Sequence, residues 1–105
     1  VSTIGPNDGW CDDPSEPAYN KRVILPHTGG HETLYRTDSL YDIVVPLGYN
    51  DDPPIAGKGS AIFMHIARDD YSTTEGCVAV AQTDLLTILT LTGPEDILAI
   101  NPPQL

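Results

Sequence analysis

Residues 59–68 read GSAIFMHIAR, residues 74–80 read TEGCVAV, and these two runs decide the fold. The first run is apolar almost to its end, which is typical of a buried strand that delivers His65 near its terminus. The second run places Cys77, directly after a glycine, at the start of another apolar strand. Twelve positions separate His65 from Cys77, and residues 69–73 between them are rich in turn-forming types. The spacing therefore predicts two strand ends joined by a loop.

A thiol and an imidazole in this arrangement favour nucleophilic chemistry. An isolated cysteine ionises about 1–2 pH units above neutrality, so it needs a nearby histidine to react as a thiolate. We predict Cys77 as the nucleophile and His65 as its base, with the N–H groups of Gly76 and Cys77 as oxyanion donors. A backbone carbonyl near Ile66 or Ala67 is the expected partner of the imidazole. A plainer interpretation stays open, in which Cys77 is a buried small side chain and His65 is merely hydrogen-bonded.

His65 and residues 74–77 (TEGC) resemble the catalytic signature of the L,D-transpeptidase (YkuD-type) family. In that family a histidine precedes a Ser/Thr-x-Gly-Cys segment that carries the nucleophile. Residues 9–14 (GWCDDP) and 41–45 (YDIVV) are also similar to one bacterial branch of the family. The resemblance extends over most of the chain.

The resemblance implies a fold as well as a chemistry. Residues 1–105 are expected to form a single, mainly β domain: a YkuD-type β-sandwich with one or two short helices, whose N-terminal strands are missing from this chain. The sheet edge left by those strands would need a second chain to complete it. Two positions depart from the commoner family pattern, which has His before Gly-Cys and Arg two places after the Cys. Glu75 and Ala79 stand there instead, which bears on substrate preference.

The substrate that the resemblance implies is the stem peptide of bacterial peptidoglycan. Cys77 would attack the L,D amide bond next to a terminal D-residue, and the acyl-cysteine would then pass to an amine. If water accepts the acyl group, the same site is an L,D-carboxypeptidase; a catalytically inactive cell-wall-binding descendant is a further alternative. No cofactor or metal is implied. The substrate places the protein in the bacterial cell envelope (periplasm).

Four further residues are candidates for substrate binding, namely Thr74, Arg68, His31 and Tyr41. Thr74 would support the loop or bind the substrate. Arg68 would bind a carboxylate as a fork or pair with a neighbouring aspartate at the surface. His31 would orient the substrate or begin a turn over residues 32–35. Tyr41 lies in one of the stretches that resemble the family.

The composition excludes several partners. Fifteen acidic and five basic residues give a formal charge of −10, which argues against binding to nucleic acid or to an anionic membrane surface. No apolar run approaches the roughly 18–20 residues that span a bilayer, and no basic-then-apolar signal peptide is apparent. At 105 residues the chain is expected to be one domain with one main core.

The two cysteines, Cys11 and Cys77, allow one disulfide bond. A structural bridge is the usual outcome in an oxidising compartment. It would remove the nucleophile and leave a small disulfide-stapled domain without chemistry. A reversible bridge formed near the site under oxidation is an intermediate possibility.

The N-terminal region is rich in Pro and Gly, so long regular elements are not expected there. His27 and His31 have a spacing typical of metal ligands, but an intervening Gly-Gly pair breaks any helix that would align them, so we expect no zinc site. Asp12 and Asp13 fit a turn cap, a cation ligand or a partner for a substrate amine. Trp10 is expected to anchor this segment to the core.

The remaining elements are short. Apolar, β-branched runs predict strands at residues 23–25 and 40–50, the second buried on both faces, with an edge, a bulge or a strand end at Pro46. An apolar stripe over residues 85–89 predicts a helix that Thr83 caps and that ends at a Gly-Pro pair. Residues 97–100 predict a final strand.

Overall fold

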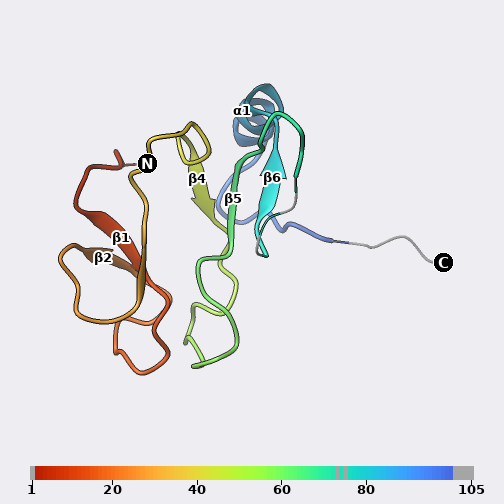
Figure 1. Ribbon diagram of the computed structural model, residues 1–105. Coiled ribbons are helices and arrows are strands. Elements are labelled where there is room, and N and C mark those ends of the chain that lie inside the picture. Colours follow the sequence, from red (N-terminus) through yellow and green to blue (C-terminus); the bar gives the residue numbers. More distant parts are fainter. Residues whose placement is uncertain (1, 73, 75, 101–105) are drawn as a thin grey trace.

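The computed structural model describes residues 2–72, 74 and 76–100, and its regular elements are six short strands and one helix (Figure 1). In chain order they are β1 (Asp8–Cys11), β2 (Arg22–Ile24), β3 (His31–Thr33), β4 (Val44–Pro46), β5 (Phe63–Ile66), β6 (Val78–Val80) and α1 (Gln82–Leu91). The mainly β class predicted from the sequence is therefore confirmed. No helix within the described ranges is long and apolar enough to cross a membrane.

The first sheet, sheet A, is antiparallel and has the order β2-β1-β3. In the pairing of β1 with β3, Trp10 lies opposite Glu32 and Cys11 lies opposite His31. Residues directly opposite each other in a β-pair point to the same face of the sheet, and neighbours along a strand point to opposite faces. Trp10 and Glu32 therefore share one face, and Cys11 and His31 share the other.

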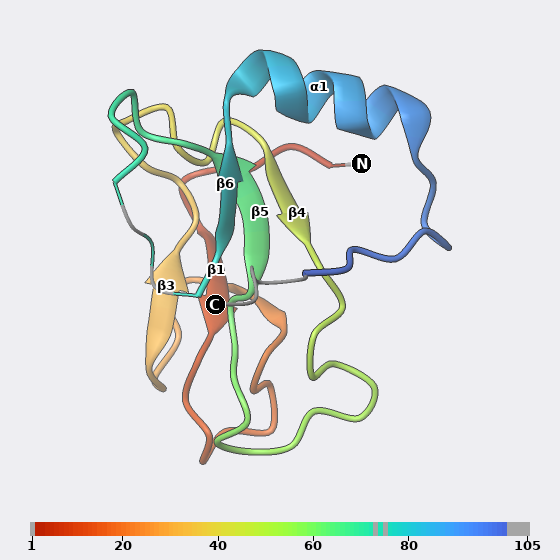
Figure 2. The same cartoon turned by 90° about the vertical axis from the view of Figure 1, so that its right-hand side faces the viewer.

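The second sheet, sheet B, has the order β4-β5-β6 and lies beside sheet A (Figure 1). β4 and β5 are antiparallel, whereas β5 and β6 are parallel. Figure 2 shows the three strands side by side, with α1 across one end of them. All four residues of β5 are buried, because it is the central strand and both of its faces are covered.

Two apolar cores join these layers. The core between the sheets contains Leu34, Ala61 and Phe63. The core between sheet B and the helix contains Met64, Ile66 and Leu85. Since alternate residues of β5 point to opposite faces, this one strand contributes to both cores. Each large apolar side chain that is fully buried contributes roughly 1.5–3 kcal/mol.

The buried side chain of Asn20 links the N-terminal segment to the chain that leads into β5. Its Oδ1 accepts hydrogen bonds from Nε1 of Trp10 at 3.0 Å and from the backbone N–H of Ala61 at 3.3 Å. Its Nδ2 donates to the carbonyl oxygens of Tyr49 and Asn50 at 2.9 and 2.6 Å. The Trp10 ring also packs edge-on against the core phenylalanine of β5, at 5.0 Å between centroids. Trp10 thus anchors its segment to the core, as predicted.

The predicted strand at residues 40–50 is shorter in the structure. Only β4 is regular, and the residues of its strand are half-buried or exposed rather than buried on both faces. Gly48 and Asn50 adopt φ angles of 73° and 55°, which extended backbone cannot accommodate. Of the three outcomes expected at Pro46, the structure shows two, because this residue ends β4 and β4 is an edge strand of its sheet.

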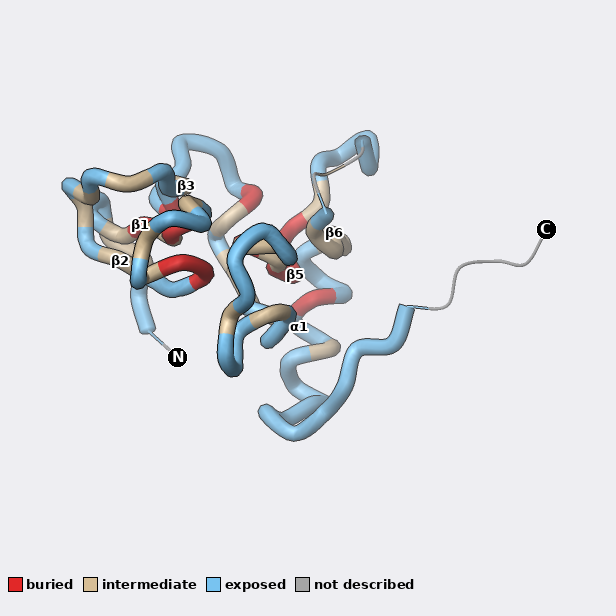
Figure 3. Tube along the Cα trace, turned by 90° about the horizontal axis from the view of Figure 1, so that it is seen from below, coloured by how far each residue is buried: buried red, intermediate tan, exposed pale blue. Residues whose placement is uncertain are grey.

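At the C-terminal side, the predicted strand at residues 97–100 is wrong. These residues are exposed, and their trace leaves the body of the molecule without meeting a sheet edge (Figure 3). The predicted helix is confirmed and ends at Leu91, before the Gly-Pro pair. Its cap position is Ala81 and not Thr83, because β6 leads directly into the first turn.

Candidate active site

The register of sheet B places Cys77 and His65 on the same face of that sheet. Met64 pairs with Val78, so Cys77 lies one position earlier, beside Phe63. Because side chains alternate along a strand, Phe63, His65 and Cys77 face sheet A. The packing agrees, since Cys77 contacts the core between the sheets whereas Met64 and Val78 belong to the core under the helix.

A cavity of about 410 Å³ lies at this face. Five of its lining residues were predicted from the sequence as site residues: Cys77, His65, Thr74, Arg68 and Tyr41. The others are Asp12, Glu32, Arg36, Leu40, Ser60 and Ala61. The structure therefore gathers a thiol, an imidazole, two carboxylates and two guanidinium groups around one hollow.

The imidazole of His65 is buried and held in one orientation. Its Nδ1 lies 2.8 Å from the carbonyl oxygen of Ile66. A carbonyl oxygen only accepts hydrogen bonds, so Nδ1 carries the proton and Nε2 of the neutral ring has a free lone pair. The backbone carbonyl predicted to orient the imidazole is thus that of Ile66. The ring of Tyr41 packs against the imidazole with 5.2 Å between centroids.

The thiol of Cys77 is half-buried and donates a hydrogen bond to the carbonyl oxygen of Ala61, at 3.3 Å. Burial raises the pKa of this thiol above its ordinary value, and the charge of Glu32 acts in the same direction, while a backbone hydrogen bond from Phe63 opposes them. The thiol is therefore protonated at neutral pH, and the described residues include no hydrogen bond between it and His65. Both cysteines are free, so the structure does not form the disulfide bond that was considered as an alternative.

The segment that presents Cys77 has a constrained backbone. Gly76 adopts a φ of 84°, in the left-handed region that favours glycine, and a Cβ added there would lie 3.4 Å from Cδ1 of Ile62. The hydroxyl of Thr74 donates to the carbonyl oxygen of Cys77 at 2.6 Å. Of the two roles considered for Thr74, support of the loop is the one seen in the structure.

Tyr41 connects the imidazole to a carboxylate that the sequence did not indicate. Its hydroxyl donates a hydrogen bond to Oε1 of Glu32. Burial, and then the hydrogen bond to Glu32, raise the pKa of the Tyr41 phenol, so this group remains a donor. Tyr41 therefore packs against His65 on one side and holds Glu32 at the cavity wall on the other.

The two arginines of the cavity differ in their partners. Arg36 makes a two-pronged ion pair with Asp38, at 2.8 and 2.6 Å, and its guanidinium carbon lies 5.2 Å from the centre of the Tyr41 ring. Arg68 pairs with no carboxylate in the described part of the chain. The surface ion pair considered for Arg68 with a neighbouring aspartate is thus not formed.

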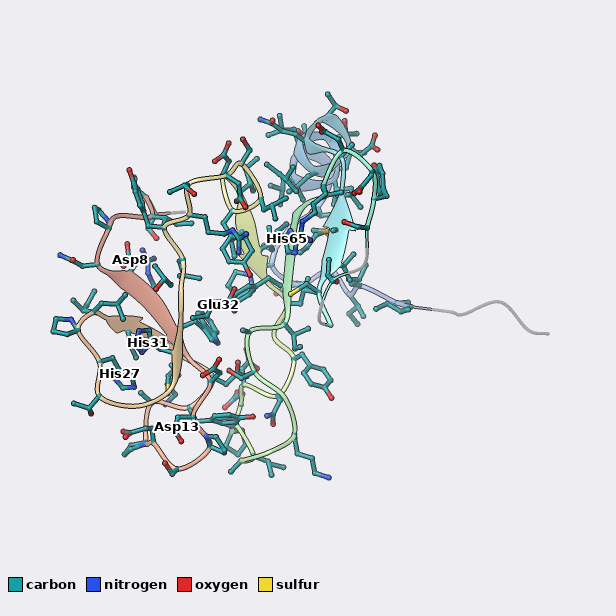
Figure 4. The ribbon with its side chains drawn as sticks, in the orientation of Figure 1. Asp8, Asp13, His27, His31, Glu32 and His65 are labelled. Carbon is teal, nitrogen blue, oxygen red and sulfur yellow. The ribbon has the colours of Figure 1, made fainter. Side chains whose placement is uncertain are left out.

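The structure does not bring His31 into the cavity. Its exposed ring lies beside that of His27, at 6.0 Å between centroids, and its Nδ1 contacts the carbonyl oxygen of Gly29 at 3.0 Å (Figure 4). The reason is strand alternation. His31 begins a strand rather than the expected turn, so its side chain takes one face of sheet A and that of Glu32 takes the face toward His65 (Figure 4).

Asp13 caps a turn, which is one of the roles that the sequence predicted for it. Its carboxylate accepts hydrogen bonds from the hydroxyl and the backbone N–H of Ser15, at 2.7 and 3.0 Å, and from the N–H of Gly30 at 3.0 Å. The pKa of Asp13 is lowered to about 2, first by the side-chain hydrogen bond from Ser15 and then by the two backbone hydrogen bonds. Its neighbour Asp12 lines the cavity instead.

Glu32, Arg36 and Ser60 line the cavity but were not predicted as site residues, whereas Asp12 had been considered as a partner for a substrate amine. An available signal was the alternation of residues 31–33, had that segment been interpreted as a strand. The described residues contain no group of three His, Cys, Asp or Glu side chains placed to hold a metal ion. No protein-family model, curated protein or solved structure matches the chain.

Proposed function

We propose that the protein is a cysteine-dependent acyltransferase of the L,D-transpeptidase type, which acts on peptidoglycan stem peptides in the bacterial cell envelope. The observation that carries the proposal is that Cys77 and His65 share one face of sheet B and line the same cavity. The resemblance of residues 74–77 to the Ser/Thr-x-Gly-Cys motif supports the substrate class. The two packed sheets are compatible with a YkuD-type β-sandwich.

The chemistry begins from a protonated thiol. Nε2 of His65 takes the thiol proton as the sulfur of Cys77 attacks the amide carbonyl. The S–C bond forms, the oxyanion is held by the N–H groups of Gly76 and Cys77, and the C–N bond then breaks as the imidazolium returns its proton to the departing amine. An acceptor amine next attacks the thioester, forms a new amide and restores the thiol. Water in place of that amine gives L,D-carboxypeptidase activity.

The neutral thiol has a mechanistic consequence. Because burial raises the pKa of Cys77, the thiolate is not preformed, and proton transfer to His65 must accompany attack. A base that acts only in the transition state typically contributes about 10²–10⁴-fold in rate.

β4 is an edge strand of sheet B, and we propose that a second chain adds a strand there and so completes the sheet.

The direct test is covalent modification of Cys77. Incubation with a carbapenem should add the mass of one inhibitor to the protein, and peptide mapping should locate it on Cys77. A tetrapeptide stem with a D-amino acid as acceptor should give the exchanged peptide, and Cys77→Ser should abolish it. Unchanged turnover in Cys77→Ser would defeat the proposal. Turnover that yields only the hydrolysed tripeptide would assign the carboxypeptidase alternative, and intact Cys77 without turnover would assign the inactive descendant.

A further inference from the structure

The cavity holds a carboxylate that makes no ion pair within the described part of the chain. Glu32 is half-buried and accepts a hydrogen bond from Tyr41. No Lys, Arg or His in the described part of the chain forms an ion pair with it. Arg36 lies close enough for the charge of Glu32 to help raise its pKa, but its guanidinium is held by both oxygens of Asp38. A carboxylate that is partly withdrawn from water and makes no direct ion pair favours the binding of a further cation.

The position of Glu32 relates it to the reacting groups. It projects from β3 toward the face of sheet B that carries His65 (Figure 4), and Arg68, which follows β5 along the chain, lines the same cavity. Strands β3 and β5, from different sheets, thus lead to a carboxylate and a guanidinium group that line the same cavity. The charge of Glu32 reaches the nucleophile, since it contributes to the raised pKa of Cys77.

We infer that Glu32, positioned by Tyr41, binds a primary ammonium group of the peptide that occupies the cavity. The inference rests on the proposed function and makes the substrate more specific: a stem peptide that carries a free amine on its diamino acid. Glu32 is then a specificity-determining residue and not a base. A bound ammonium group would also neutralise the carboxylate and so remove its opposition to ionisation of Cys77.

Binding can be measured separately from chemistry in Cys77→Ala. The probes are the tetrapeptide L-Ala-γ-D-Glu-L-Lys-D-Ala and the same peptide with its lysine amine acetylated, titrated by calorimetry. Acetylation should raise Kd by about tenfold, the equivalent of about 1.4 kcal/mol, and this difference should fall below about twofold when Glu32→Gln is added. The matched control is Asp12→Asn, the other carboxylate of the cavity, which should keep the tenfold difference.

A second measurement distinguishes binding from a structural role. In the protein that retains Cys77, Glu32→Gln should speed alkylation of the thiol by iodoacetamide at a fixed pH below the thiol pKa, because one cause of the raised pKa is removed. Equal Kd values for the two peptides, absence of binding by both, or transfer of the preference to Asp12 would overturn the inference. If Cys77 is acylated by the carbapenem but the preference is absent, the inference fails alone. If the preference is present but Cys77 is never acylated, the proposed function fails alone.

Discussion

Nδ1 of His65 donates to the carbonyl oxygen of Ile66 at 2.8 Å, and this contact determines which ring nitrogen remains unprotonated. The acceptor is a backbone carbonyl, which a side-chain substitution does not remove. The orientation of the imidazole therefore depends on the backbone at the end of β5. Nε2 is left without a hydrogen-bond partner in the described part of the chain. The base of the proposed mechanism is thus prepared by strand geometry and not by a third catalytic side chain.

Replacing the imidazole tests this arrangement. His65→Ala should slow carbapenem acylation of Cys77 by about 10²–10⁴-fold, because the thiol proton loses its acceptor. The rate is followed by intact-protein mass spectrometry. His31→Ala is the matched control, since His31 is exposed on the other face of sheet A. It should leave the rate unchanged. An equal loss in both variants would contradict the site as described.

The pH dependence of thiol labelling should reflect the raised pKa of Cys77. In His65→Ala the thiol must ionise without a base, so its iodoacetamide labelling rate should still be rising at pH 9.0, the ordinary thiol pKa. The sign follows from burial, which disfavours the charged form and lowers the thiolate fraction at any given pH. The same protein in denaturant gives the reference profile. A plateau in the folded protein below that of the denatured one would contradict the prediction.

The two cysteines should also differ in accessibility. Cys11 is fully buried, so iodoacetamide should label it only after unfolding, whereas Cys77 should be labelled in the native protein. Peptide mapping after native and denatured labelling separates the two. A disulfide in fresh, non-reduced protein, seen as resistance of both cysteines in denaturant, would contradict the free thiols of the structure.

Gly76→Ala should destabilise the protein by about 1–2 kcal/mol, the cost of placing a Cβ in left-handed backbone. The φ of 84° makes this cost independent of the space around the residue. Urea unfolding gives the free energy. Gly93→Ala is the matched control, because no atom lies within 4 Å of a Cβ built there, and it should be nearly neutral. Similar losses in the two variants would show that the conformation of Gly76 is not the cause.

The buried amide of Asn20 should be among the more costly polar side chains to remove. Its four hydrogen bonds contribute about 1 kcal/mol each, so Asn20→Ala should lower the free energy of unfolding by roughly 3–4 kcal/mol. Asn7→Ala is the control, since Asn7 is exposed, and a change within about 0.5 kcal/mol is expected. A loss below about 1 kcal/mol for Asn20→Ala would show that the four contacts contribute little.

The lowered pKa of Asp13 predicts that the free energy of unfolding decreases at acid pH. Its pKa is about 2 in the folded protein and near 3.8 in the unfolded chain, so its contribution is fully present above 3.8 and is lost as the pH falls toward 2. The stability difference between the wild-type protein and Asp13→Asn, measured by urea unfolding, should therefore shrink from about pH 5 to about pH 2. The exposed Asp52 gives the control Asp52→Asn, whose difference should not follow this course. A constant difference for Asp13→Asn would contradict the lowered pKa.

Local patterns were sufficient for several features of this protein. The apolar run before His65 gives β5, the run after Gly76 gives β6, and a stripe of period 3.6 gives α1. The short strand predicted at residues 23–25 is β2, displaced by one residue. Each of these depends on neighbours in the sequence, which is why the sequence alone could indicate it.

The prediction of a final strand was wrong because an apolar run forms a strand only when the edge of another strand lies beside it. Residues 97–100 have the right composition but no such edge in the described structure. The strand that contains His31 and Glu32 was missed for a related reason. The alternation of these residues is local, but the segment forms a strand because it pairs with β1, some twenty residues away along the chain.

The sequence by itself determined several features: a cysteine that follows a glycine, a histidine at the end of an apolar strand, an acidic composition and a mainly β class. Only the tertiary structure decided that Cys77 and His65 face one cavity, that Cys11 stays apart from them, and that Glu32 rather than His31 completes the wall. The physical reason is register. A shift of one residue between paired strands turns every side chain to the other face, and the register is set by packing between residues distant in the sequence.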